Sequence, residues 1–158
     1  MKDWTLRKLH RSRLSGESGF TLIELLVVIV IIGVLAAIAL PAFLEQRKTG
    51  NDGEAKSNAR NLVSLVEACF AETSDYLLCD TQTELGGEIG LEWGAGAGQA
   101  QVTSASGNNF EVSSASEAKT NGANHVFRIK KFTNGTQDRT CSAGGAGDDA
   151  GGCADGTW

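Results

Sequence analysis

The sequence offers little with which an enzyme could work. Its 158 residues include only two histidines, His10 and His125. No glycine-rich loop ends in a phosphate-binding lysine, and no nucleophile stands in a recognisable catalytic motif. A lone histidine in a strand-like segment is more often a surface or strand residue than a catalytic base. The sequence therefore predicts a protein that is not an enzyme and that needs no cofactor.

Aromatic and basic residues are also scarce. Aromatic side chains make up 6% of the chain, which argues against long-range conduction along stacked rings. Residues 1–18 carry a net charge of +3, which leaves −8 for residues 19–158 because the whole chain has −5. This acidic balance argues against a nucleic-acid groove and favours a soluble, self-repelling outer domain.

The longest apolar run is nearly free of charge. Phe20 to Leu44 is 25 residues with Glu24 as the one charged side chain. As a helix the run is about 37 Å long, enough to cross a hydrocarbon core of about 30 Å. A buried core helix is the alternative, but the rest of the chain is too polar to wrap a helix that is apolar on every face. The positive charge before the run predicts that the N-terminus stays in the cytoplasm.

The carboxylate in this run needs a reason to be there. An acidic residue at the centre of a membrane helix is disfavoured by roughly 2.5–3.5 kcal/mol, and by less near the interface. A basic segment followed by an apolar one also fits a secretory signal peptide, for which "AAIALPA" would imitate a cleavage site. A stronger cleavage signal lies before the run, at Ser18-Gly19-Phe20.

A short basic leader followed by "GFTLIELLVVIVIIGVLAAIALPAF" closely resembles the class III signal of type IV pilins and of the related pseudopilins of type II secretion. The resemblance covers residues 19 to about 44 and fades beyond about residue 75. It implies that a prepilin peptidase on the cytoplasmic face cuts between Gly19 and Phe20 and methylates the new amino group of Phe20. Gly19 suits such a cut, because a residue without a side chain lets the peptidase approach the backbone closely.

The resemblance also implies a role for Glu24. In the family, the glutamate at this position pairs with the amino terminus of a neighbouring subunit, so Glu24 and Phe20 would register the subunits axially. The alternative, a carboxylate that merely extends to the lipid headgroups, stays open. Gly33 and Pro41 weaken the helix between them. Residues 34–40 either become extended in the fibre, as in family filaments, or contain an ordinary kink.

Beyond the apolar run, a polar segment keeps one apolar face at helical spacing: Ala55, Ala59, Leu62, Val66, Cys69 and Phe70. This pattern predicts a single helix from about Phe20 to Thr73. Its first part, residues 20–44, would span the membrane and form the filament core, and residues 45–73 would be an amphipathic half packed on a globular head. Gly50 and Gly53 form a weak point where a break is plausible.

Residues 74–158 are predicted to form that head, with three or four antiparallel strands. The β-type runs are separated by turn residues: "QAQVTSAS", "NNFEVSSAS", "NHVFRIKKF" and "GTQDRTCS". Asn134 and Gly135 are a signal for a two-residue hairpin, since both tolerate positive φ. Phe127 and Ile129 are expected to face the helix. Residues 84–98 are expected to form an exposed loop between helix and sheet. The predicted class is α+β, a long helix packed on a small antiparallel sheet with disulfide-closed loops, the pilin fold of the resemblance.

So small a core needs additional stabilisation, and the sequence contains four cysteines: Cys69, Cys79, Cys141 and Cys153. Outside a reducing compartment they can form disulfides in three connectivities, of which we prefer the two short loops, Cys69 with Cys79 and Cys141 with Cys153. A zinc site is disfavoured because no pair has the usual short spacing.

The last residues are acidic and rich in glycine. Asp148, Asp149 and Asp155 make calcium conceivable, and major pseudopilins resemble this in holding calcium near their C-terminus, but the spacing matches no known loop. We expect a solvated loop without a metal. Trp158 is expected to pack against the head.

Three functions remain open. The first is a structural subunit of a type IV pilus, in particular the major pilin, which polymerises through its N-terminal helix into an extracellular filament for adhesion, motility or DNA uptake. Its partners would be copies of itself, the prepilin peptidase, the assembly platform, minor pilins and, before assembly, the inner membrane. The second is a pseudopilin of a secretion or competence system. The third is a membrane-anchored adhesin or binding domain that never polymerises.

Overall fold

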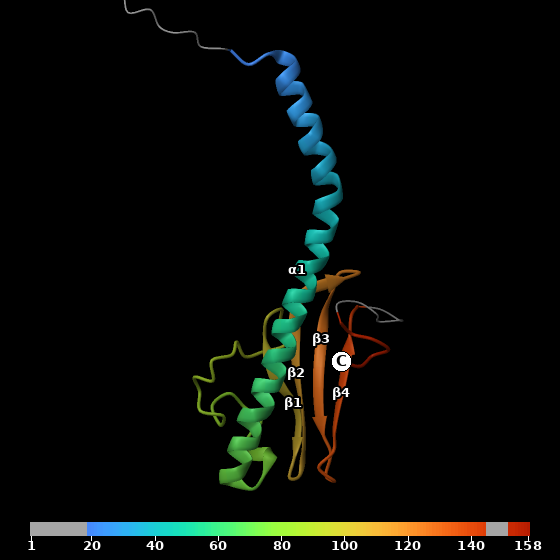
Figure 1. Ribbon diagram of the computed structural model, residues 1–158. Coiled ribbons are helices and arrows are strands. Elements are labelled where there is room, and N and C mark those ends of the chain that lie inside the picture. Colours follow the sequence, from blue (N-terminus) through green and yellow to red (C-terminus); the bar gives the residue numbers. More distant parts are fainter. Residues whose placement is uncertain (1–18, 145–151) are drawn as a thin grey trace, which may run out of the picture. The chain divides into compact units, whose positions relative to one another are not determined.

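The structure is a computed structural model that describes residues 19–144 and 152–158 (Figure 1). The elements are one helix, a short 3₁₀ turn and four strands: α1 (Leu22–Thr73), η1 (Tyr76–Leu78), β1 (Ala100–Ser106), β2 (Asn109–Thr120), β3 (Ala123–Lys131) and β4 (Gln137–Ser142). The predicted α+β class, with one long helix and an antiparallel sheet, is confirmed. The chain divides into two compact units between Ala39 and Leu40. The basic leader, residues 1–18, lies outside the described residues.

In the first unit, the helix begins at Leu22 and its side chains are exposed. Large apolar residues dominate all of its faces, among them Ile29, Ile31 and Leu35, each more than half exposed. By length and composition, α1 is able to cross a membrane. The helix is continuous through Gly33, where a Cβ would meet nothing within 4 Å.

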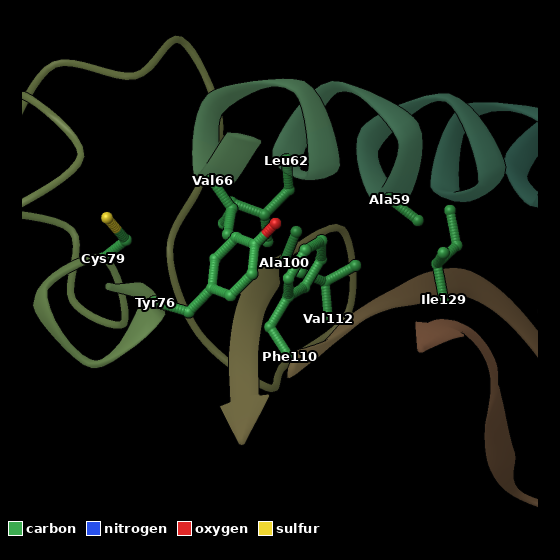
Figure 2. Packing of buried hydrophobic residues seen from close by; sticks show 9 residues of the cluster. All are labelled: Ala59, Leu62, Val66, Tyr76, Cys79, Ala100, Phe110, Val112 and Ile129. Carbon is green, nitrogen blue, oxygen red and sulfur yellow. The ribbon is translucent and has the colours of Figure 1, made fainter. Parts of the chain in front are cut away.

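In the second unit, α1 lies against one face of the sheet (Figure 1). Ala55, Ala59, Leu62 and Val66 are buried, as the helical spacing predicts. Figure 2 shows Leu62 and Val66 directed toward Phe110 and Val112 of β2, and Ala59 toward Ile129 of β3. Burial of each large apolar side chain here contributes roughly 1.5–3 kcal/mol. This stripe is what holds the helix on the sheet.

The break considered at Gly50 and Gly53 is wrong, because α1 runs through both residues without interruption. The side chain between them supplies the reason. Asp52 is fully buried against the head and hydrogen-bonded there, so tertiary contacts offset the roughly 1 kcal/mol that each glycine costs a helix.

The sheet has the order β1-β2-β3-β4, and each strand pairs antiparallel with the next. Phe127 and Ile129 face the helix, as predicted. The two-residue turn with positive φ joins β2 to β3 at Asn121 and Gly122. The prediction of such a turn at Asn134 and Gly135 is therefore wrong in type.

There the β3 to β4 connection is a longer hairpin in which Phe132 N–H donates to Thr136 O and Gly135 N–H to Phe132 O. In this connection only Gly135 has a positive φ, +82°, which fits a three-residue loop with glycine at the left-handed position.

Two disulfides close loops of the head. Cys69 near the end of α1 is joined to Cys79 after η1, and Cys141 of β4 is joined to Cys153. The second bridge holds the C-terminal residues against β4, where Cys141 N–H donates to Gly156 O over 2.8 Å. Trp158 packs edge-on against Phe127 and donates from Nε1 to Thr140 O over 3.0 Å. Its predicted packing against the head is confirmed.

A buried, hydrogen-bonded pair of polar side chains links α1 to β3. The Asp52 carboxylate and the His125 imidazole are both 0% exposed, and Nδ1 lies 2.8 Å from Oδ2 and 3.0 Å from Oδ1. On the other side of the ring, Nε2 lies 2.8 Å from Thr120 Oγ1 at the end of β2. Three elements are thus joined through one imidazole.

The sequence held a signal for this pair. Asp52 precedes Ala55 by three residues and so continues the apolar face of α1, while His125 has the same strand parity as Phe127 and Ile129. Because both positions face the core, an acid and a base there are expected to meet.

A second polar link lies near the other end of the core. Lys131 Nζ donates to Glu67 Oε1 over 2.7 Å, and the Tyr76 hydroxyl donates to Glu67 Oε2 over 2.8 Å. The hydrogen bond to Glu67 raises the pKa of Lys131, and burial raises the pKa of Tyr76. Both donors therefore keep their protons at neutral pH. Since the ion pair is partly exposed, it contributes less than about 1 kcal/mol.

The buried pair leads to a stability prediction. His125→Leu leaves the Asp52 carboxylate buried without its partner, so the free energy of unfolding of the head should fall by about 3–5 kcal/mol. Asp52→Leu/His125→Leu removes both polar groups and should be more stable than His125→Leu alone. Denaturant unfolding of the mature chain in detergent, followed by tryptophan fluorescence, measures both. If the losses of the single variants Asp52→Leu and His125→Leu add up to the loss of the double variant, the two groups do not interact.

Candidate assembly site at the start of the helix

Thr21 and Glu24 close the first turn of α1 with reciprocal hydrogen bonds. Thr21 N–H donates to Glu24 Oε2 over 3.0 Å, and the Thr21 hydroxyl donates to the same oxygen over 2.9 Å. In return, Glu24 N–H lies 3.2 Å from Thr21 Oγ1. Because α1 begins at Leu22, Thr21 stands at the N-cap and Glu24 at the third helical position, the arrangement known as a capping box.

The capping box gives Glu24 a role within its own chain, in addition to the predicted pairing between subunits. The signal was the spacing Thr-x-x-Glu before an apolar run, which typically marks a helix start. The carboxylate is also favoured beside the partial positive charge of the helix N-terminus. Both bonds from Thr21 go to Oε2, so the cap itself does not occupy the second oxygen, Oε1.

The surface around this carboxylate is apolar. A hollow of about 350 Å³ is lined by Phe20, Ile23, Glu24, Val27 and Val28 along one face of the first two turns. Phe20 is 86% exposed and Ile23 is 63% exposed. Water solvates this largely apolar surface poorly. An apolar partner with a single cation would fit it selectively, because the cation could pair with the one carboxylate.

The remaining predicted residues lie apart from this hollow. Gly19 directly precedes Phe20, and a Cβ at Gly19 would meet nothing within 4 Å. Gly33 and Pro41 lie inside α1. The four cysteines belong to the head as two disulfides.

The acidic tail is only partly described. Asp148 and Asp149 lie outside the described residues, so the structure does not test the calcium site that these residues were considered for. Within residues 19–144 and 152–158, no group of three or more acidic, histidine or cysteine side chains is arranged to hold a metal ion.

The position of His125 fits a structural role better than a catalytic one. Its order, Asp52 to His125 to Thr120, is that of an acid, a base and a hydroxyl, but the ring has no exposed surface. A base that is 0% exposed cannot reach an external substrate unless the head opens, so the arrangement fits packing and orientation.

Comparison with known proteins matches the N-terminal part of the chain to a described family and the chain to named relatives. A family model described as the prokaryotic N-terminal methylation motif matches residues 14–40. The type IV narrow pilus major component PilA5 of Thermus thermophilus is 32% identical over 106 residues, which are 65% of this chain and 91% of that protein.

Two longer relatives are matched over less of their length. The type IV major pilin protein PilA of Myxococcus xanthus is 38% identical over 93 residues, 55% of this chain and 41% of that protein. A fimbrial protein of Pseudomonas aeruginosa is 36% identical over 95 residues, 57% of this chain and 62% of that protein. The chain thus spans about half of the length of these two. No solved structure matches the chain.

The capping box is testable by itself. Thr21→Val removes the hydroxyl and should weaken the first turn by about 1 kcal/mol, which corresponds to roughly fivefold faster hydrogen exchange at the Glu24 and Leu25 amides. Exchange is measured by NMR on the mature chain in detergent micelles. Glu24→Gln is the matched control, because an amide oxygen still accepts from Thr21 and exchange should change little. Equal exchange in Thr21→Val and the parent chain would show that no cap forms.

Proposed function

The chain belongs to the type IV pilin family, and on that basis we propose that it is a structural subunit, in particular the major pilin, of a type IV pilus. The observation that carries the proposal is the first turn of α1, where Glu24 is the one charged side chain of the exposed apolar stretch from Phe20 to Leu44. Relatives named as major pilins or fimbrial proteins favour a pilus subunit over a secretion pseudopilin or a plain anchor. The proposed role is structural, without catalysis.

The precursor is inserted in the inner membrane through the apolar half of α1, with its basic N-terminus in the cytoplasm. A prepilin peptidase then cuts between Gly19 and Phe20 and methylates Phe20. The match of the methylation motif to residues 14–40 supports this step. The exposed position of both residues at the helix start is compatible with access by the peptidase. The assembly platform and minor pilins are its further partners.

Cleavage creates the cation that the Glu24 site lacks. In a bundle of apolar helices the new amino group of one subunit and the Glu24 carboxylate of the next are both costly when unpaired. Their opposite charges compensate each other at only one axial offset between the two subunits, so that offset is selected. The capping box assists, because it fixes the carboxylate through Oε2 and leaves its orientation defined before docking.

Gly33 and Pro41 weaken the helix between them during assembly. Glycine lowers helix propensity by about 1 kcal/mol, and proline removes one backbone bond. Residues 34–40 would then become extended in the fibre while the cap at Thr21 and the head contacts hold both ends.

Processing predicts a defined mature N-terminus. Mass spectrometry of subunits from sheared filaments should find a chain that begins at N-methylated Phe20. The reason is the Gly19-Phe20 pair directly before the capped helix. A terminus after Ala39 or Ala42 would instead identify an ordinary signal peptide and contradict the pilin proposal.

Glu24→Gln separates the charge from the cap. Glutamine can still accept from Thr21, but it cannot pair with the amine of Phe20 on the neighbouring subunit. Breaking a buried pair costs about 3–5 kcal/mol, so filament recovery should fall by about a hundredfold or more, with a normal membrane pool of processed subunit. Recovery is measured by shearing and immunoblotting both fractions.

Thr21→Val is the matched control for that experiment. It keeps the charge and loses the cap, so filaments should form at close to parental levels. Parental filament levels in Glu24→Gln combined with loss in Thr21→Val would assign Glu24 to capping alone and contradict axial registration.

A further inference from the structure

Asparagine followed by glycine occurs twice in the head, at Asn121-Gly122 and at Asn134-Gly135. An asparagine in such a pair loses its side-chain amide more readily than other asparagines, because glycine has no Cβ to shield its backbone nitrogen. That nitrogen attacks the side-chain carbonyl carbon of the asparagine when the two atoms meet. In a folded protein, the rate of this reaction depends on whether hydrogen bonds hold the two groups apart.

The Asn134-Gly135 pair is held by hydrogen bonds on both of its reacting groups. Asn134 Oδ1 accepts from Thr136 N–H over 3.0 Å and from the Thr136 hydroxyl over 2.7 Å. Gly135 N–H, which carries the attacking nitrogen, donates to Phe132 O over 2.9 Å. These bonds have to open before the nitrogen can reach the side-chain carbon of Asn134.

The Asn121-Gly122 pair lacks such restraints. The two residues form the turn between β2 and β3, with φ of +52° and +83°, the conformation in which Asn-Gly is preferred. Both residues are exposed. Within residues 19–144 and 152–158, neither the Asn121 side chain nor Gly122 N–H has a hydrogen-bond partner. The carbonyl carbon and the nitrogen that attacks it are therefore both available.

We propose that Asn121 is a site of self-modification, at which the folded head loses the side-chain amide and gains a carboxylate. The Gly122 nitrogen gives its proton to water or hydroxide and forms a bond to Asn121 Cγ. The bond between Cγ and Nδ2 breaks, and Nδ2 takes up a proton and leaves as ammonia. The product is a five-membered succinimide ring. Water then adds to one of the two ring carbonyls and gives aspartate or isoaspartate, with no change of oxidation state.

The modified turn lies beside the buried polar pair. Thr120 directly precedes Asn121, and its hydroxyl lies 2.8 Å from His125 Nε2. The other nitrogen of the same ring contacts Asp52 of α1. The turn therefore positions one of the three side chains that join α1, β2 and β3.

The two products affect this turn differently. Aspartate tolerates the same positive φ, and Asp-Gly is also preferred in a two-residue turn, so the aspartate form changes the charge alone. Isoaspartate routes the main chain through Cβ and lengthens it by one carbon. The turn then no longer fits its two strand ends, and the hydrogen bond from Thr120 to His125 is weakened.

Conversion thus adds one negative charge to a head, and the isoaspartate form also makes the head less stable. The reaction needs water and the folded head but no enzyme. Converted chains accumulate with time, so the turn records the age of a subunit. Because the reaction takes place within one chain, the inference goes beyond the proposed pilus function and does not depend on it.

Peptide mapping of the mature chain, aged in detergent at neutral and at mildly alkaline pH, tests the proposal. Replacement of the amide by a hydroxyl raises the peptide mass, and chromatography separates isoaspartate from aspartate. Each hydrogen bond lowers the population of the open form by about fivefold, so Asn121 should convert roughly tenfold to a hundredfold faster than Asn134. The rate should rise with pH, because the attacking nitrogen has to lose its proton. Digestion in ¹⁸O-labelled water marks conversion that occurs during handling.

Two controls isolate the effect of the fold. In the denatured chain with reduced disulfides, Asn121 and Asn134 should convert at similar rates, because neither turn exists there. Asn121→Gly is the matched variant, since Gly-Gly is also preferred in this turn but has no amide to lose. In denaturant unfolding, the aged parent chain should contain a second, less stable population that the aged variant lacks.

Similar rates at Asn121 and Asn134 in the folded chain overturn the proposal, and so does faster conversion at Asn134. An intact Asn121 after an interval that converts the denatured chain also overturns it. Conversion without a less stable population overturns the effect on the buried pair. These results leave the pilus function standing, since filament recovery tests it separately. The peptide map uses the parent chain, so it decides the proposal even if Asn121→Gly does not fold.

Discussion

The carboxylate of Glu24 stands alone among the apolar side chains from Phe20 to Leu44, and it has to be satisfied in every state that the helix passes through. Within the single chain the Thr21 hydroxyl and N–H supply two hydrogen bonds. In the bilayer these bonds and the helix dipole lower the penalty without removing the charge. In the filament, the proposed pairing with the Phe20 amine removes the net charge. One residue thus caps the start of the helix and, under the proposed pairing, makes docking selective.

The part of α1 that packs on the sheet uses an acidic side chain in the opposite manner. Asp52 is already paired with His125 and is buried, so it joins helix and sheet within a subunit and has no capacity left for a neighbour. Around it, the apolar contacts of Leu62 and Val66 supply the binding energy, and the polar pair defines the register of helix on sheet.

Much of the fold was predictable because it follows from periodicity. The 3.6-residue spacing of Ala55, Ala59, Leu62 and Val66 defined the helix face, and alternation in β3 placed Phe127 and Ile129 inside. Periodicity also pointed to Asp52 and His125, but polar residues on a core face were not treated as partners. No break occurs at Gly50 and Gly53, because the low helix propensity of glycine is outweighed by tertiary contacts. Turn type at Asn134 failed because an Asn-Gly pair is compatible with both two-residue and three-residue hairpins. The capping box was missed because Glu24 was considered only for its partner in another chain.

The most direct measurement of the central claim is the distance between the Phe20 amine of one subunit and the Glu24 carboxylate of its neighbour in an assembled filament. Solid-state NMR can measure it in filaments that mix subunits labelled with ¹⁵N at Phe20 and subunits labelled with ¹³C at the Glu24 carboxyl, since only contacts between subunits then give dephasing. The account predicts dephasing between these labels, at a strength that puts the Phe20 nitrogen within ion-pair distance, about 4 Å, of a carboxylate oxygen bonded to the labelled carbon. Absence of dephasing between these labels in well-ordered filaments would contradict it, and would assign Glu24 to capping its own helix.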